Sequence, residues 1–278
     1  MAKTNEELKD KINGAHAPLS ERQAPNKLQV TYKHVAKQIK AAASGDEDLG
    51  KQIYVSFHEA VTANPKLMDC TTSSLGTCMV LSAMTGLLPE PWKDAAYVPY
   101  GKQAQFQPTY LGLVKLARQC GTVRAVQMEV VHEGDHFFYN LGTEPKLEFM
   151  KAPRDRGDEH YVYCILELSN GNKEIEVMTY DEVEKIRKGC ANSNSPAWRD
   201  HWEAMAKKTI LKRALKTHSK DRRLSTAISV DNISERPDLS AATQRAVAQS
   251  VTEAIEEADA QDAEEQDRAM DLSFEGTS

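Results

Sequence analysis

The spacing of hydrophobic residues changes twice along this chain, and that order constrains the fold more than any other feature. Up to residue 86, apolar residues recur at helical intervals, as in the stripe of Ile53, Phe57 and Val61. Between residues 97 and 178, short strand-like segments alternate with turn signals, and after Pro196 the helical spacing returns. The sequence therefore predicts N-terminal helices, a central region of strands and a long C-terminal helix.

Local turn and capping signals place most of the element boundaries. Gly101-Lys102 between two strand-like runs predicts a β-hairpin over residues 97–107, and Asn170-Gly171 predicts another. Thr179 has the capping-box spacing that opens a helix, and this helix is expected to end at Gly189. The other expected helices cover 28–43, 47–63, 73–86 and 109–119, and the other expected strands cover 123–131, 136–141, 145–150, 160–169 and 173–178.

Charge is distributed unevenly along the chain. The formal net charge is −6, but residues 231–278 contain 13 acidic and 3 basic side chains, so residues 1–230 hold 28 acidic and 32 basic ones. The segment Arg199–Arg223 alone carries nine basic and three acidic residues. An acidic tail on a basic body favours binding of a polyanion by the body, with the tail as regulator or docking arm. An ordinary solvated face is the alternative.

Composition also divides the chain into three parts. Residues 1–27 contain scattered glycine, proline and charge and are predicted to be a flexible N-terminal arm. Residues 28–230 hold the hydrophobic periodicity and form the folded body. Residues 231–278 are predicted to be a largely disordered acidic tail with a marginal helix over 239–258, because little apolar surface remains to anchor it.

The helix expected over residues 197–218 is the most informative segment. Lys208, Lys212 and Lys216 recur every four residues, which gives a row spaced by about 6 Å, close to the spacing of phosphates on an extended strand. Trp202 lies on the same stripe, and cations beside aromatic rings are typical of single-strand binding. A solvated basic face with the tryptophans in the core explains the pattern equally well, and we favour the core for Trp202.

The predicted hairpin offers a second polar patch. Its glutamines supply donors and acceptors that bind phosphate or sugar oxygens without sequence preference. The alternative is an exposed polar hairpin that binds no ligand. For Tyr110, two roles are open: its ring stacks on a base, or it packs in the core. The patch comprises Tyr100, Lys102, Gln103, Gln105, Gln107 and Tyr110.

Several function classes lack their motifs. The chain has neither of the phosphate-binding glycine loops, G-x-x-x-x-G-K-[ST] and G-x-G-x-x-G, and it has no G-x-S-x-G motif. Its five cysteines are widely spaced without C-x-x-C pairing. Residues 132–136 match the zinc-protease signature H-E-x-x-H, but Gly134-Asp135 predicts a turn, which does not hold two histidines in helical register. No signal peptide or membrane span is expected, and the cysteines lack disulfide-type spacing, so we predict a reduced, cytoplasmic protein. We also expect no catalytic residue, metal or cofactor.

Five segments, in this order, resemble the RecT family of phage single-strand annealing proteins, relatives of Redβ. The resemblance covers roughly residues 28–225. It also accounts for residues 131–135, because the family has a V-x-E-G-D turn there. The segments that carry it are Ser74–Glu90, Ala96–Gln107, Tyr110–Ala117, Val131–Asp135 and Trp202–Arg213.

The resemblance implies an α+β fold with N-terminal helices, a β-hairpin and a small antiparallel sheet beside a long basic helix, a Redβ/Rad52-like annealing core. It implies a homo-oligomer, as a ring or helical filament, that binds single-stranded DNA, anneals complementary strands without ATP and holds the nascent duplex. It also implies two partners in the bacterial host, a 5′→3′ exonuclease and the single-strand binding protein. Residues 28–230 would then be the oligomerising and annealing domain.

The residues expected to contact DNA follow from the helix and the hairpin together. Lysines and arginines of the helix would bind phosphates, and the hairpin would form a second wall. Two function classes remain as alternatives, a metal-dependent hydrolase that uses His132 and His136, and a duplex-binding architectural protein. The expected contacts are Lys102, Gln103, Gln105, Gln107, Tyr110, Lys115, Arg199, Lys207, Lys208, Lys212, Arg213 and Lys216.

Overall fold

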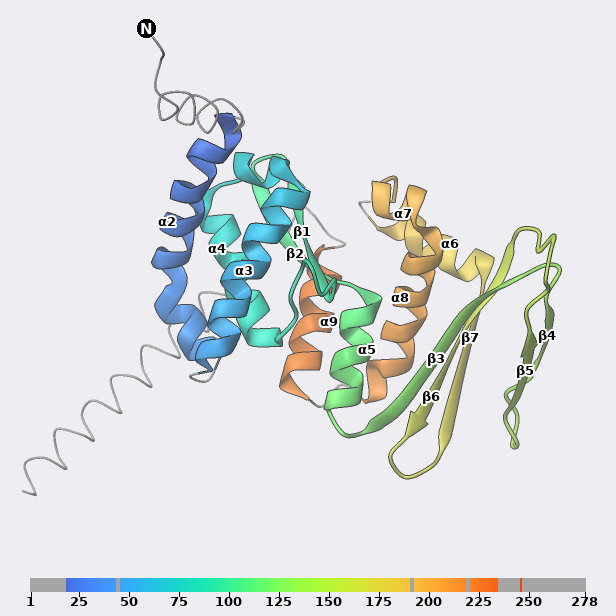
Figure 1. Ribbon diagram of the computed structural model, residues 1–278. Helices are drawn as coiled ribbons and strands as arrows, with labels where there is room; N and C mark the ends of the chain where they lie inside the picture. The colour runs from blue at the N-terminus through green and yellow to red at the C-terminus, as the bar shows by residue number, and fades with distance from the viewer. Residues whose placement is uncertain (1–18, 44–45, 191–192, 219–220, 235–245, 247–278) are drawn as a thin grey trace, which may run out of the picture.

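The computed structural model confirms the predicted α+β class. N-terminal helices lie on one side of the molecule and a sheet lies on the other, with α5 (Tyr110–Gln119), α8 (Trp202–Ala214) and α9 (Arg222–Ser234) between them (Figure 1). One hydrophobic core runs through all of these elements. The residues that the structure describes are 19–43, 46–190, 193–218, 221–234 and Ala246.

The N-terminal helices match the predicted segments, apart from the first start. α2 (Leu19–Ala42) begins well before the expected residue 28, so residues 19–27 of the expected arm are helical. In α3 (Glu47–Ala63), the Asp46 side chain caps the first turn by accepting two backbone N–H bonds of 3.0 Å. The short helix η1 (Pro65–Asp69) leads to α4 (Thr72–Thr85).

A β-hairpin follows α4, as predicted. β1 (Ala95–Tyr100) and β2 (Gln103–Pro108) are antiparallel, and the turn between them uses Gly101 with φ of 58°. Successive side chains of a strand point to opposite faces, so Gln103, Gln105 and Gln107 share one face. The hairpin leads directly into α5, where Thr109 caps the helix by accepting from the N–H of Gly112.

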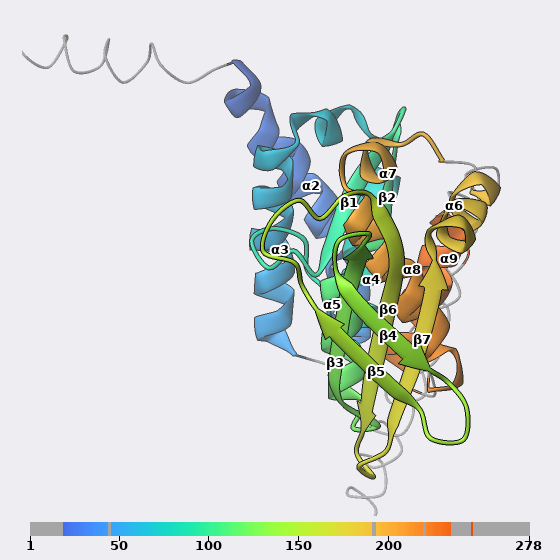
Figure 2. The same cartoon turned by 90° about the vertical axis from the view of Figure 1, so that its right-hand side faces the viewer.

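The main sheet has three antiparallel strands, in the order β3 (Val123–His132), β6 (Glu159–Leu168) and β7 (Lys173–Thr179). The Asn170-Gly171 turn joins β6 to β7, as predicted. β4 (His136–Asn140) and β5 (Lys146–Met150) form a separate hairpin across the sheet face opposite α8 (Figure 2). Phe137 attaches it to the sheet, since its ring lies 5.8 Å from that of Tyr163.

The long helix expected over 197–218 is interrupted. α6 (Tyr180–Gly189) begins with the predicted capping box, but α7 (Pro196–Asp200) ends before His201, and α8 then starts in a new direction. The last part, η2 (Leu215–Thr217), is a 3-10 turn. Because of the break, the two tryptophans occupy different environments: Trp198 is buried in the core, and Trp202 is only partly buried.

α9 is an element that the sequence analysis did not predict. Leu224, Ala227 and Val230 are fully buried on its inner face, and Asp231 is fully buried as well. The predicted tail boundary at residue 231 therefore falls inside a packed helix. The expected helix over 239–258 lies outside the described residues except for Ala246. Within the described part of the chain, no helix combines the length and apolar character needed to cross a membrane.

Candidate nucleic-acid interface

A cleft of about 510 Å³ opens where α7 and α8 meet the start of α5 and the start of β6. Three of the twelve residues expected to contact DNA line it, Tyr110, Arg199 and Lys207. Tyr110 is far from Arg199 and Lys207 in the sequence, so the cleft is a product of the tertiary fold. The other lining residues are Glu159, Asp200, His201, Trp202, Glu203 and Ala204.

The two cations of the cleft are held differently. The Arg199 side chain is 67% exposed and forms two bonds, of 2.8 and 3.0 Å, to the Asp200 carboxylate. Such an exposed pair contributes little stability, so the guanidinium can exchange its partner for a phosphate. The Lys207 side chain is only 16% exposed, and its Nζ lies 3.0 Å from an oxygen of Glu129. The ion pair with Glu129 therefore holds the Lys207 ammonium group in one position at the cleft.

Trp202 is held by specific contacts beside the cleft. Its Nε1 donates to Glu184 Oε1 at 2.8 Å, and its ring stacks on Tyr180 with centroids 5.1 Å apart. Burial acts to raise the pKa of Glu184, but hydrogen bonds from Arg187 and Trp202 hold that pKa below its usual range. Glu184 therefore stays ionised and anchors the indole.

The basic row expected along the helix is not a solvent-facing row, which corrects the sequence analysis. Lys208 and Lys212 both pair with Asp231 of α9, and their side chains are only 9% and 13% exposed. The four-residue spacing places both ammonium groups on the face that packs against α9. Lys216 alone of the three is exposed, in η2.

Arg213 and Lys115 are placed away from the cleft lining. Arg213 is half-exposed and pairs with Glu176 at 3.2 Å and Glu182 at 3.5 Å, on the side of β7 and α6. Lys115 donates to Asp94 at 2.5 Å and to the Gly86 carbonyl at 3.3 Å, which links α5 to the loop before the hairpin. Both side chains have protein partners that a phosphate would have to replace.

The hairpin patch is only partly available to a ligand. Lys102 is exposed at the turn and Gln103 is half-buried, whereas Gln105 is 2% exposed, which corrects its assignment as a surface contact. The amide of Gln107 donates to Tyr100 Oη at 3.1 Å. The tip therefore presents a cation and an amide, while the middle of β2 belongs to the packed interior.

The H-E-x-x-H match is a turn between strands, as predicted. His132 ends β3 and the exposed His136 begins β4, and the N–H of Asp135 donates back to the His132 carbonyl at 3.0 Å. Hydrogen bonds from Arg156 hold the pKa of Asp135 far below its usual range. This strand–turn–strand geometry does not provide the one-face helical arrangement of a zinc protease.

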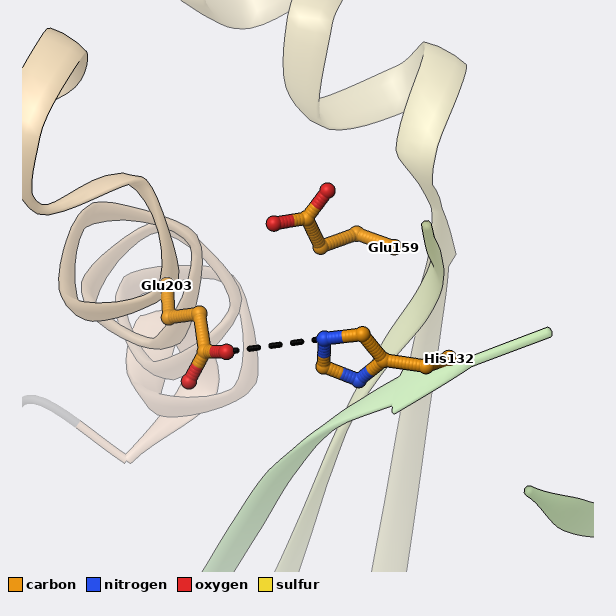
Figure 3. Close-up of side chains that lie close together, drawn as sticks. All are labelled: His132, Glu159 and Glu203. Atoms are coloured by element: carbon orange, nitrogen blue, oxygen red, sulfur yellow. Dashed lines mark ion pairs between the residues drawn. The ribbon is translucent and has the colours of Figure 1, made fainter. Parts of the chain in front are cut away.

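The structure instead brings His132 together with two carboxylates that sequence reasoning missed. Glu159 and Glu203 approach it at the edge of the cleft (Figure 3). The His132 Nε2 lies 3.6 Å from Glu203 Oε1. No motif signalled this cluster, because its members are distant in sequence and belong to three different elements.

A family model and two relatives match most of this chain. The model of the RecT family matches residues 52–266. The protein RecT of Escherichia coli strain K12 is 28% identical over 230 residues, which is 80% of this chain and 85% of that protein. The uncharacterized protein YqaK of Bacillus subtilis strain 168 is 29% identical over 219 residues, 76% of this chain and 74% of that protein.

Proposed function

The chain belongs to the RecT family of recombination-related single-strand annealing proteins, and on that basis we propose that it binds single-stranded DNA and anneals complementary strands without ATP. The observation that supports this most is the cleft, where Arg199 and Lys207 lie beside Tyr110 and Trp202. Cations along the phosphate backbone, next to aromatic rings on which bases stack, are typical of proteins that bind single strands without sequence preference. The protein would act by presenting the strand, with no catalytic residue.

The strand path in this proposal starts at the cleft and continues past other exposed cations. Arg199 and Lys207 would bind neighbouring phosphates, and Lys102 at the hairpin tip and Lys216 in η2 would extend the path. Tyr110 would stack on a base, while Trp202, held by Glu184 and Tyr180, would support the wall. Lys208 and Lys212 are left out because both pair with the fully buried Asp231, and Gln105 is left out because it is buried.

Assembly and partners complete the proposal. A single cleft contacts only a few nucleotides, so protomers would line one strand as a ring or helical filament in the cytoplasm of the bacterial host. A 5′→3′ exonuclease would supply the strand and the host single-strand binding protein would share it. The acidic residues beyond Ser234 are repelled by a phosphate-lined groove, so we assign them to regulation or docking.

The affinity for single strands should fall steeply with salt. Binding of a short labelled oligonucleotide is measured by fluorescence anisotropy, without nucleotide, at several salt concentrations. Each phosphate contact contributes about −0.7 to the slope of log affinity against log salt, so two cations of the cleft predict a slope of about −1.4 or steeper.

A duplex of equal length is the comparison ligand in this experiment. Tighter binding to the single strand supports annealing, whereas a preference for preformed duplex supports an architectural protein. A slope near zero would contradict a phosphate-binding cleft.

A further inference from the structure

The cluster at the edge of the cleft is formed by three separate elements. His132 is the last residue of β3, Glu159 is the first residue of β6, and Glu203 lies in the first turn of α8. One ligand atom from each side chain lies within 4.8 Å of the others. Figure 3 shows the Glu203 carboxylate facing the imidazole, with the Glu159 side chain on another side of the ring.

The backbone holds this arrangement in place. His132 and Glu159 are register partners across β3 and β6, next to a register shift at Val131, so their side chains lie side by side. The His132 N–H donates to Asp135 Oδ2 at 2.9 Å, which fixes the end of the strand. Its side chain is only 11% exposed. The ligand atoms are therefore held by the sheet and by α8.

The two ring nitrogens of His132 have different surroundings. Nδ1 is buried without a hydrogen-bond partner, and the nearest carboxylate, that of Asp135, is 3.9 Å away. Nε2 faces Glu203 at 3.6 Å. A proton on Nδ1 would face the Asp135 charge and leave the Nε2 lone pair free toward the cluster. In this tautomer Nε2 presents the lone pair with which a histidine binds a metal.

The charges around the cluster are unbalanced. Glu159 and Glu203 lie close together, and within the described residues neither forms an ion pair with a lysine or arginine. The nearby cations have other partners, because Lys207 pairs with Glu129 and Arg199 pairs with Asp200. Arg156, whose charge also interacts with that of Glu203, forms its ion pair with Asp135. Two carboxylates in a cleft that receives phosphates would repel the DNA strand, unless a cation lies between the two carboxylates.

We propose that His132 Nε2 and the carboxylates of Glu159 and Glu203 bind one divalent ion of the first transition row, Zn²⁺ or Mn²⁺. An imidazole nitrogen with two carboxylates suits these ions, whereas Mg²⁺ prefers oxygen ligands alone. Zn²⁺ bonds of about 2.0–2.2 Å require ligand atoms about 3.4 Å apart, close to the 3.6 Å between His132 Nε2 and Glu203 Oε1. Metal binding would therefore draw the carboxylate of Glu159 inward from within the 4.8 Å that the cluster spans. Three protein ligands leave a coordination position open toward the cleft.

The open position gives the ion a role at the interface. A bound divalent ion converts two repelling carboxylates into a neutral site, and its open position accepts a phosphate oxygen of the strand. This second step rests on the proposed function, whereas metal binding itself does not. The ion would therefore add one phosphate contact to those of Arg199 and Lys207.

Titration calorimetry on the full chain, made metal-free by a chelator, tests the site. One ion of Zn²⁺ or Mn²⁺ should bind per chain, and Mg²⁺ should bind at least tenfold more weakly. Glu203→Gln should weaken Zn²⁺ binding at least tenfold, because it removes a charged ligand at a half-exposed position that the fold tolerates. His136→Gln is the matched control, since this exposed histidine lies outside the cluster, and it should leave the affinity unchanged.

The outcomes separate the site from adventitious binding. Equal affinity in wild type and Glu203→Gln, an equal loss in His136→Gln, or equally tight Mg²⁺ binding would each overturn the proposed site. Thermal unfolding in chelator verifies that both variants are folded.

A DNA-binding arm tests the second step. In chelator, the wild type should bind the oligonucleotide. After the chelator is removed, one added equivalent of Zn²⁺ or Mn²⁺ should strengthen binding severalfold in wild type but not in Glu203→Gln. If the ion binds without changing DNA affinity, the phosphate contact is wrong and the metal site stands. If no DNA binding occurs under either condition, the proposed function fails independently of the metal.

Discussion

Replacing Asp231 with alanine is expected to lower the free energy of unfolding by about 3–5 kcal/mol. Asp231 is fully buried in α9 and pairs with both Lys208 and Lys212, whose side chains are themselves nearly buried. Without the carboxylate, two largely buried ammonium groups lose the negative charge that they share. Urea unfolding followed by circular dichroism measures the loss.

The same substitution at an exposed ion pair is the control. Asp200→Ala removes the partner of Arg199 on the surface and should change the free energy of unfolding by less than about 1 kcal/mol. A loss this small for Asp231→Ala would show that the lysines are solvated, and the expected basic row would then be open to a strand after all. A truncation meant to remove only the acidic tail must accordingly end after Ser234.

The effect of Asp231 should depend on pH. Burial acts to raise the pKa of its carboxyl group, but the charges and hydrogen bonds of Lys208 and Lys212 hold that pKa below its usual range. A lowered pKa in the folded state stabilises the protein fully above the unfolded-state pKa and loses this contribution as the pH falls through the folded-state value. The stability difference between wild type and Asp231→Ala should therefore shrink in acid.

The double substitution Arg199→Ala and Lys207→Ala should weaken oligonucleotide binding by about 10- to 100-fold at low salt. Each cation contributes roughly one phosphate contact, so the salt slope should also become less steep by about 0.7 per residue removed. Anisotropy titrations of both proteins at several salt concentrations measure affinity and slope together.

Arg124→Ala is the control for the loss of a surface positive charge outside the cleft. Arg124 is an exposed arginine on β3 that also pairs with a carboxylate, Glu167 at 3.1 Å, but it does not line the cleft. It should lower the affinity only slightly. An equal loss in the control, or an unchanged slope in the double variant, would move the strand path away from α7 and α8.

The elements that the sequence predicted correctly are those specified by local chemistry. The hairpin around Gly101, the Asn170-Gly171 turn and the capping box at Thr179 each depend on neighbouring residues alone, and each is present in the structure. The α+β class followed from the same local signals and from the resemblance.

The features that the sequence did not predict depend on distant partners. A four-residue spacing of lysines is the same for an exposed row and for a buried ion pair, and only Asp231 of α9 distinguishes the two. Gln105 lies between Ala104 and Phe106, and all three are buried by packing that the polar character of the glutamine does not reveal. The H-E-x-x-H match drew attention to His136, whereas the partners of His132 come from β6 and α8.

Strand annealing in the absence of nucleotide tests the central claim most directly. Two complementary oligonucleotides that carry a donor and an acceptor dye are mixed with the full chain, and energy transfer follows their pairing. The account predicts pairing much faster than in buffer alone, at the same rate with or without ATP, and slower in the Arg199→Ala, Lys207→Ala variant than in Arg124→Ala. Pairing no faster than in buffer, or pairing that requires ATP, would contradict it.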